Sequence, residues 1–143
     1  MGELSQAPDW GNSTDRAVPP ELLLRLSAEP SAAAQARDAL AAFAETMPAE
    51  ALADLRLVVT ELVTNSVKYG PGGPIVVSVK RGSDGAVSGE VLDGGRAGVR
   101  MRRSPNPAGG GLGLQIVDAV ATAWGVRPRS TRVWFRIDPI WAA

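Results

Sequence analysis

The 143-residue sequence contains neither cysteine nor histidine. Without thiols and imidazoles the chain lacks soft metal ligands, a cysteine nucleophile and a histidine base, which excludes zinc and haem sites and Ser-His-Asp catalysis. Fifteen basic residues balance fifteen acidic ones, so no overall positive field attracts nucleic acid or an anionic membrane. The remaining chemistry must use carboxylates, amides, hydroxyls, basic side chains and backbone groups, with magnesium as a natural metal for such oxygen ligands.

Long apolar runs are also missing. No stretch is long and apolar enough for a transmembrane helix, and the first residues lack a basic segment followed by a long apolar one. We therefore expect a cytoplasmic protein that does not contact membrane or nucleic acid directly. The length suits one domain with its own core. We expect residues 21–138 to form this domain, residues 1–20 to be a disordered tail rich in turn-forming residues, and residues 139–143 to be a C-terminal tail.

Hydrophobic periodicity predicts the order of the elements. Alternating apolar residues predict strands, and apolar residues spaced by three or four predict helices. The predicted strands are 22–26, 75–80, 86–92 and 133–137, with a short one at Val126, and the predicted helices are 31–47, 48–70 and a third from Leu112 to before Gly125. The order β-α-α-β-β-loop-α-β-β predicts an α+β fold, a two-layer sandwich in which three helices cover one face of a mixed, mostly antiparallel sheet.

Glu61 and Asn65 lie four residues apart in the second predicted helix, so both side chains project from one face. An asparagine offers one neutral oxygen to a magnesium ion whose other ligands are phosphates and waters. Glu61 would then act on a nucleophile. Taken alone, the pair also fits two solvated polar residues on the outside of a helix.

Two glycine-rich segments follow. Asp93 ends a predicted strand and precedes Gly94 and Gly95; its acceptor-only carboxylate beside small residues suits the amino group of adenine, although an ordinary turn aspartate is the alternative. The segment 109–114 places glycines directly before an apolar helix, where backbone N–H groups and the helix dipole favour a phosphate, the alternative being a hinge. Residues 94–111 between them are typical of a lid or binding loop.

These three elements occur together and in order, and they resemble the motifs of the GHKL superfamily of ATP-binding domains. Glu61-Leu-Val-Thr-Asn65-Ser-Val-Lys68 resembles the N box, and Asp93-Gly-Gly95-Arg-Ala97 and Gly109-Gly-Gly111-Leu-Gly113-Leu resemble the two glycine boxes. Within the superfamily, segments 55–66, 116–120, 124–126 and 131–135 are similar to anti-sigma-factor serine/threonine kinases of Gram-positive bacteria. The resemblance covers residues 22–137.

The resemblance implies roles for individual residues. Asn65 would be a ligand of Mg²⁺, Glu61 would activate the attacking hydroxyl, and Asp93 would bind the adenine of ATP. The residues expected at the nucleotide are Asn65, Lys68, Asp93, Gly95, Ala97, Gly109, Gly111, Leu112 and Gly113. Many relatives carry a histidine just after the N box, where this chain has Lys68 and Tyr69.

The resemblance also implies partners, namely a sigma factor and an anti-sigma antagonist protein whose serine or threonine accepts the phosphoryl group, with a homodimer as a further possibility. Three alternatives stay open at this point. One is a non-catalytic nucleotide-binding regulator of the same fold that sequesters a partner. The others are the catalytic part of a histidine kinase and a plain α+β domain without nucleotide.

Overall fold

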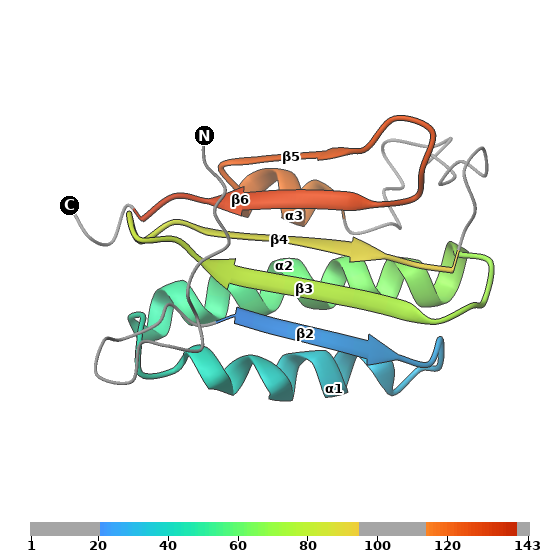
Figure 1. The fold of residues 1–143 in the computed structure, drawn as a ribbon, viewed down its shortest axis with the longest axis horizontal. Coiled ribbons are helices and arrows are strands. Elements are labelled where there is room, and N and C mark those ends of the chain that lie inside the picture. Colours follow the sequence, from blue (N-terminus) through green and yellow to red (C-terminus); the bar gives the residue numbers. More distant parts are fainter. Residues whose placement is uncertain (1–20, 95–113, 140–143) are drawn as a thin grey trace, which may run out of the picture.

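The computed structural model describes residues 21–94 and 114–139, which form a sheet backed by helices on one face (Figure 1). The elements are β2 (Glu21–Leu26), α1 (Ala32–Ala39), the 3-10 helix η2 (Leu40–Phe43), α2 (Ala49–Tyr69), β3 (Ile75–Arg81), β4 (Val87–Leu92), α3 (Leu114–Val120), β5 (Ala123–Val126) and β6 (Val133–Ile137). The predicted tail at residues 1–20 lies outside the described residues, as do residues 140–143. Neither described range contains a helix that is long and apolar enough to span a membrane.

The sheet has five strands in the order β2-β3-β4-β6-β5. All pairings between the described strands are antiparallel, whereas a mixed, mostly antiparallel sheet was expected. Residues 82–86 join β3 to β4 and residues 127–132 join β5 to β6, and such short hairpin connections make the joined strands antiparallel. Between β2 and β3 the chain forms α1 and α2, and β3 then runs opposite to β2. The predicted α+β two-layer sandwich is confirmed.

The core lies between the sheet and the helices, and α2 is its centre. This helix contacts α1, α3 and β4. Its apolar stripe and alternate residues of β3 supply buried residues to one hydrophobic core, as the sequence pattern predicted. The fully buried members of this core include Leu55, Val59, Leu62, Ile75, Val77 and Val79. Each such side chain contributes roughly 1.5–3 kcal/mol relative to an exposed one, so α2 is held firmly against the sheet.

Two helix boundaries differ from the prediction. The helix expected over residues 31–47 ends at Ala39 and continues as η2, in which Leu40 and Phe43 are both fully buried. Three residues make one turn of a 3-10 helix, so this tighter winding points both side chains to the core. The described part of α3 ends at Val120, and the chain then enters β5, where the Trp124 indole N–H donates to Asp118 at 2.9 Å.

Candidate nucleotide site

The last turns of α2 carry three of the predicted site residues. Glu61, Asn65 and Lys68 are spaced by four and three residues, which places them on one side of the helix. Glu61 is partly buried, Asn65 is 4% exposed and Lys68 is exposed. Asn65 is therefore a buried amide, whose oxygen and nitrogen can form hydrogen bonds with a polar ligand.

Asp93 follows β4 and meets the end of α2. A Cβ atom placed on Gly70, the residue after this helix, would lie 2.8 Å from Asp93 Oδ2 and 2.5 Å from the Ser66 carbonyl oxygen. The Asp93 carboxylate, in a residue only 4% exposed, therefore lies against the Gly70 backbone. With a helix rise of about 1.5 Å per residue, Asn65 is about 7.5 Å further along the α2 axis and Glu61 about 13.5 Å. The structure thus places Asp93 at the end of the helix that carries the first predicted motif.

Thr131 is a residue of this region that the sequence did not point to. The register of β4 and β6 pairs Val91 with Val133, and continuing it by two residues places Thr131 opposite Asp93. Thr131 is 2% exposed, and its hydroxyl finds no hydrogen-bond partner in the described part of the chain. The buried Thr131 hydroxyl and the buried Asp93 carboxylate therefore lie at the ends of two neighbouring strands, on the core side of the sheet. Their proximity becomes visible only when β4 and β6, which are distant in sequence, are paired.

The glycine boxes fall mostly outside the described residues. This applies to Gly95, Ala97, Gly109, Gly111, Leu112 and Gly113, and to the loop arginines at 96, 100, 102 and 103. The described chain stops at Gly94, beside Asp93, and resumes at Leu114, where α3 begins and packs against α2. Both ends of the predicted binding loop are thus attached to elements that border the candidate site.

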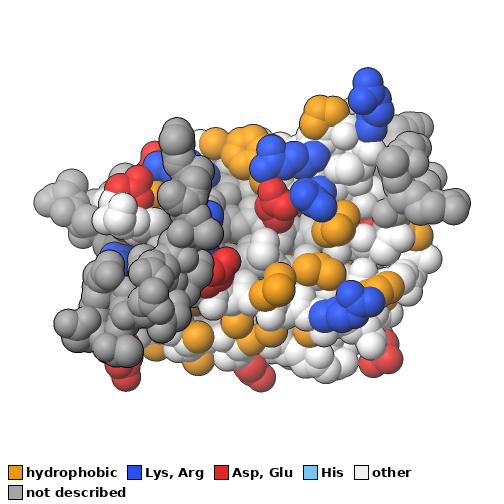
Figure 2. All heavy atoms as spheres, in the orientation of Figure 1, with side chains coloured by type: hydrophobic (Ala, Val, Ile, Leu, Met, Phe, Trp, Pro, Cys, Tyr) orange, Lys and Arg blue, Asp and Glu red, His pale blue; other side chains and the backbone are white. Residues whose placement is uncertain are grey.

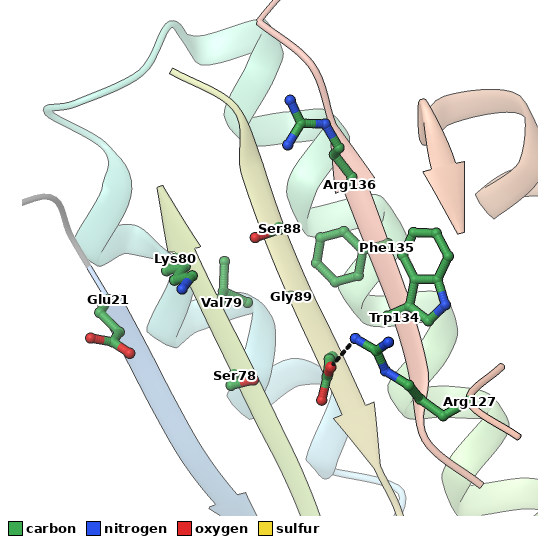
Figure 3. A pocket seen from close by; sticks show the side chains of 11 residues that line it. Glu21, Ser78, Val79, Lys80, Ser88, Gly89, Arg127, Trp134, Phe135 and Arg136 are labelled. Atoms are coloured by element: carbon green, nitrogen blue, oxygen red, sulfur yellow. Dashed lines mark hydrogen bonds and ion pairs between the residues drawn. The ribbon is translucent and has the colours of Figure 1, made fainter. Parts of the chain in front are cut away.

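A hollow among the described residues lies away from the predicted site residues. It measures about 500 Å³ and lies on the face of the sheet without helices, which Figure 2 shows from the front (Figures 2 and 3). Glu90 accepts from Arg127 at 2.8 Å there, and the Arg127 guanidinium stands 5.9 Å from the Trp134 ring centre. None of the predicted site residues lines it, so we locate the candidate site on the helical side, where the buried polar groups gather.

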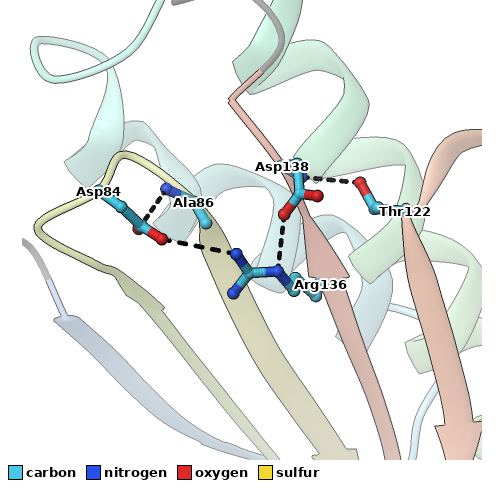
Figure 4. Close-up of polar contacts among 5 residues, drawn as sticks. All are labelled: Asp84, Ala86, Thr122, Arg136 and Asp138. Atoms are coloured by element: carbon cyan, nitrogen blue, oxygen red, sulfur yellow. Dashed lines mark hydrogen bonds and ion pairs between the residues drawn. The ribbon is translucent and has the colours of Figure 1, made fainter.

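A polar cluster at the far end of β4 is structural in character (Figure 4). Asp84, in the β3–β4 turn, accepts from the Ala86 N–H at 2.9 Å and faces Arg136 at 3.5 Å. Arg136 donates to Asp138 at 2.6 Å, and the Asp138 N–H donates to Thr122 at 2.8 Å. The cluster joins the ends of both hairpins, away from the end of β4 that carries Asp93.

Comparison with known proteins decides the family. The model of the histidine kinase-like ATPase domain matches residues 26–137, which is most of the chain. The chain belongs to this family. The resemblance to GHKL ATP-binding domains is thereby confirmed, and the matched range includes α2, Asp93 and Thr131.

One solved structure resembles this histidine kinase-like ATPase domain along most of its length. It is the crystal structure of the RsbU and RsbW domains of Rv1364c from Mycobacterium tuberculosis, with 25% sequence identity and a TM-score of 0.64. The similarity covers 85% of this chain and 32% of that chain, so the present domain spans about a third of the other protein's chain. No curated protein matches significantly.

The described residues of this ATPase-family domain contain no group of three or more acidic side chains close enough to hold a metal ion alone. The Asn65 amide on α2 offers one neutral oxygen, and Glu61 lies one turn away on the same helix. A single amide oxygen fits a magnesium ion that takes its other ligands from phosphates and water.

Proposed function

We propose that this chain is an ATP-dependent serine/threonine protein kinase of the anti-sigma-factor type. It binds ATP with Mg²⁺, phosphorylates an anti-sigma antagonist protein and sequesters a sigma factor. The observation that carries the proposal is the meeting of Asp93 with the end of α2, inside a domain of the histidine kinase-like ATPase family. The similarity to a chain with an RsbW domain supports the kinase and its partners.

The three roles follow one another along α2. Asp93 lies at the Gly70 end, Asn65 lies further along the axis and Glu61 lies further still. A nucleotide with its base at Asp93 and its phosphates along α2 therefore passes Asn65 before its terminal phosphate reaches Glu61. Lys68, Gly95, Ala97, Gly109, Gly111, Leu112 and Gly113 complete the nucleotide site in this proposal.

Asp93 selects adenine in this proposal. A carboxylate only accepts hydrogen bonds, so it pairs with the amino group of adenine and is repelled by the carbonyl oxygen of guanine. We expect Asp93→Asn to weaken ATP binding about tenfold or more, because a buried charged partner is removed. Competition titrations measure this, and equal competition by GTP and ATP in the wild type would contradict the assignment.

Asn65 and Glu61 serve the transfer of the γ-phosphate in this proposal. Magnesium, when bound, neutralises phosphate charge, and Asn65 would supply its one protein oxygen. Glu61 takes the proton from the serine or threonine hydroxyl of the antagonist, whose oxygen forms a bond to the γ-phosphorus. The bond from that phosphorus to the β,γ-bridging oxygen breaks, and ADP leaves with the electron pair.

Labelled ATP tests the proposal directly. The protein is incubated with magnesium, candidate antagonist proteins and ATP that is labelled at the γ-phosphate. Nucleotide binding and transfer of the label are measured separately. We expect Glu61→Gln to abolish transfer and to keep binding, while Glu50→Gln, a carboxylate change in the first turn of the same helix, leaves both intact. Binding without transfer in the wild type would select the non-catalytic partner-sequestering regulator instead.

A further inference from the structure

Three glycines lie close to Asp93 or to the residue that follows it. Gly70 ends α2, Gly73 lies in the turn before β3, and Gly94 follows Asp93 itself. A methyl group on Gly70 would stand 2.5 Å from the Ser66 carbonyl oxygen and 2.8 Å from Asp93 Oδ2. It would therefore press on the last turn of α2 and on the Asp93 carboxylate at the same time.

Gly73 and Gly94 touch each other main chain to main chain. A Cβ atom on Gly94 would lie 2.5 Å from the Cα of Gly73, and one on Gly73 would lie 3.0 Å from the Cα of Gly94. Relaxed contacts between carbon atoms are about 3.5–4.0 Å. A side chain on either residue must therefore push the two segments apart, because no rotation of a flexible side chain can relieve a contact between backbones.

Two contacts limit the position of Asp93. Its carboxylate lies against the Gly70 backbone, and the next residue, Gly94, is held by its contact with Gly73. A displacement of roughly half an ångström at either place shifts the carboxylate oxygens by a similar amount. Hydrogen bonds occupy a window of only about 0.5 Å in donor–acceptor distance, so the pairing of Asp93 with a base would be lost.

We infer that Gly70, Gly73 and Gly94 are positioning residues for nucleobase selectivity, a role that rests on the proposed adenine function of Asp93. The three glycines hold the carboxylate where it meets an exocyclic amino group. In this proposal the phosphates are bound by Asn65, Glu61 and the second glycine box, a set that includes none of the three glycines. Substitutions here therefore remove the preference between bases more than they remove nucleotide binding as such.

ATP and ITP distinguish the two effects, because ITP carries a carbonyl oxygen where ATP carries the amino group. With magnesium present, we expect the wild type to prefer ATP by about tenfold or more. In Gly70→Ala, Gly73→Ala and Gly94→Ala the ratio of the two affinities should fall to near one, chiefly through weaker ATP binding. In an Asp93→Asn background the same changes should cost ATP binding little more, because they act through the removed carboxylate.

Gly72 gives the matched control in the same turn. Its φ is +98°, and a Cβ there would meet nothing within 4 Å, so Gly72→Ala strains the turn without pressing on Asp93. We expect this variant to melt lower and to keep the ATP preference. Gly73→Ala has the mildest of the three clashes, so it keeps the test decisive if the other two variants do not fold.

The outcomes separate this inference from the function on which it rests. A wild type that binds no adenine nucleotide refutes both. A wild type that prefers ATP, with folded glycine variants that prefer it equally, overturns the positioning role alone. Equal losses of ATP and ITP binding in these variants also overturn it, because a general structural defect would then explain them.

Discussion

Replacing Thr131 by valine should stabilise the free protein and weaken nucleotide binding at the same time. The two side chains have nearly the same shape, so the change removes a hydroxyl and little else. That hydroxyl belongs to a residue 2% exposed, has no hydrogen-bond partner among the described residues and lies opposite Asp93 in the strand register. Its burial costs free energy in the free protein, and a ligand offers it a partner.

The magnitudes follow from that environment. Burying a hydroxyl without a partner costs about 1–3 kcal/mol in protein mutants. At roughly 3–5 °C per kcal/mol for a domain of this size, this corresponds to a rise in Tm of about 3–15 °C. A hydrogen bond to the nucleotide contributes about 0.5–1.5 kcal/mol, so its loss should weaken ADP binding about 2- to 10-fold. The two effects have opposite signs, and a general loss of structure cannot produce both.

Thermal unfolding without nucleotide and calorimetric titration with ADP and magnesium measure the two quantities. Thr60→Val is the matched control, because Thr60 also has a buried hydroxyl without a partner in the described chain but lies on α2, away from Asp93. It should raise the Tm and leave ADP affinity unchanged. An unchanged affinity in Thr131→Val would show that the hydroxyl does not face the nucleotide, and a lower Tm would show that it has a native partner.

Two further predictions concern magnesium and pH. Asn65→Ala should weaken ATP binding in the presence of magnesium and change it little with a chelator, which calorimetry measures; equal weakening in both conditions would count against a role as metal ligand. The pKa of Asp84 lies below its ordinary value of 3.8, because the Ala86 N–H and then Arg136 stabilise the carboxylate. Its contribution to the free energy of unfolding is therefore complete above the unfolded-state pKa and is lost as the pH falls through the folded-state pKa. Urea midpoints of Asp84→Asn should decline less than those of the wild type as the pH drops below about 4, and parallel curves would refute this.

The sequence predicts local elements well where their ends are marked. Pro48 and Gly70 bracket an unbroken apolar stripe, and α2 indeed runs from Ala49 to Tyr69. The change from α1 to η2 was not predicted, since Leu40 and Phe43 fit an α-helical stripe equally well and only packing against the core selects the tighter winding.

In the candidate site, too, the sequence predicts residues that have a local signal and misses those that depend on tertiary contacts. Asp93 was identified because a carboxylate before two glycines is visible in the sequence. Its acceptor-only chemistry suggested adenine, and the family resemblance implied the same role. Thr131 has no comparable local signal: it becomes notable only when β6 pairs with β4 and brings it opposite Asp93. Likewise the contact of Gly73 with Gly94 joins two segments that are distant in sequence, and neither glycine is unusual by itself.

The pairing of β4 with β6 has a consequence for how the chain folds. Residues 21–94 supply three neighbouring strands and two helices, and residues 114–139 supply α3 and the β5–β6 hairpin. Joining the two parts closes a loop through residues 95–113, a step that is slow compared with forming the hairpins. Loop-closure entropy grows only with the logarithm of length, by about 0.6 kcal/mol per doubling. Lengthening this connection should therefore slow folding modestly and cost little stability, so that the nucleotide site, and not the stability of the fold, sets the limits on its sequence.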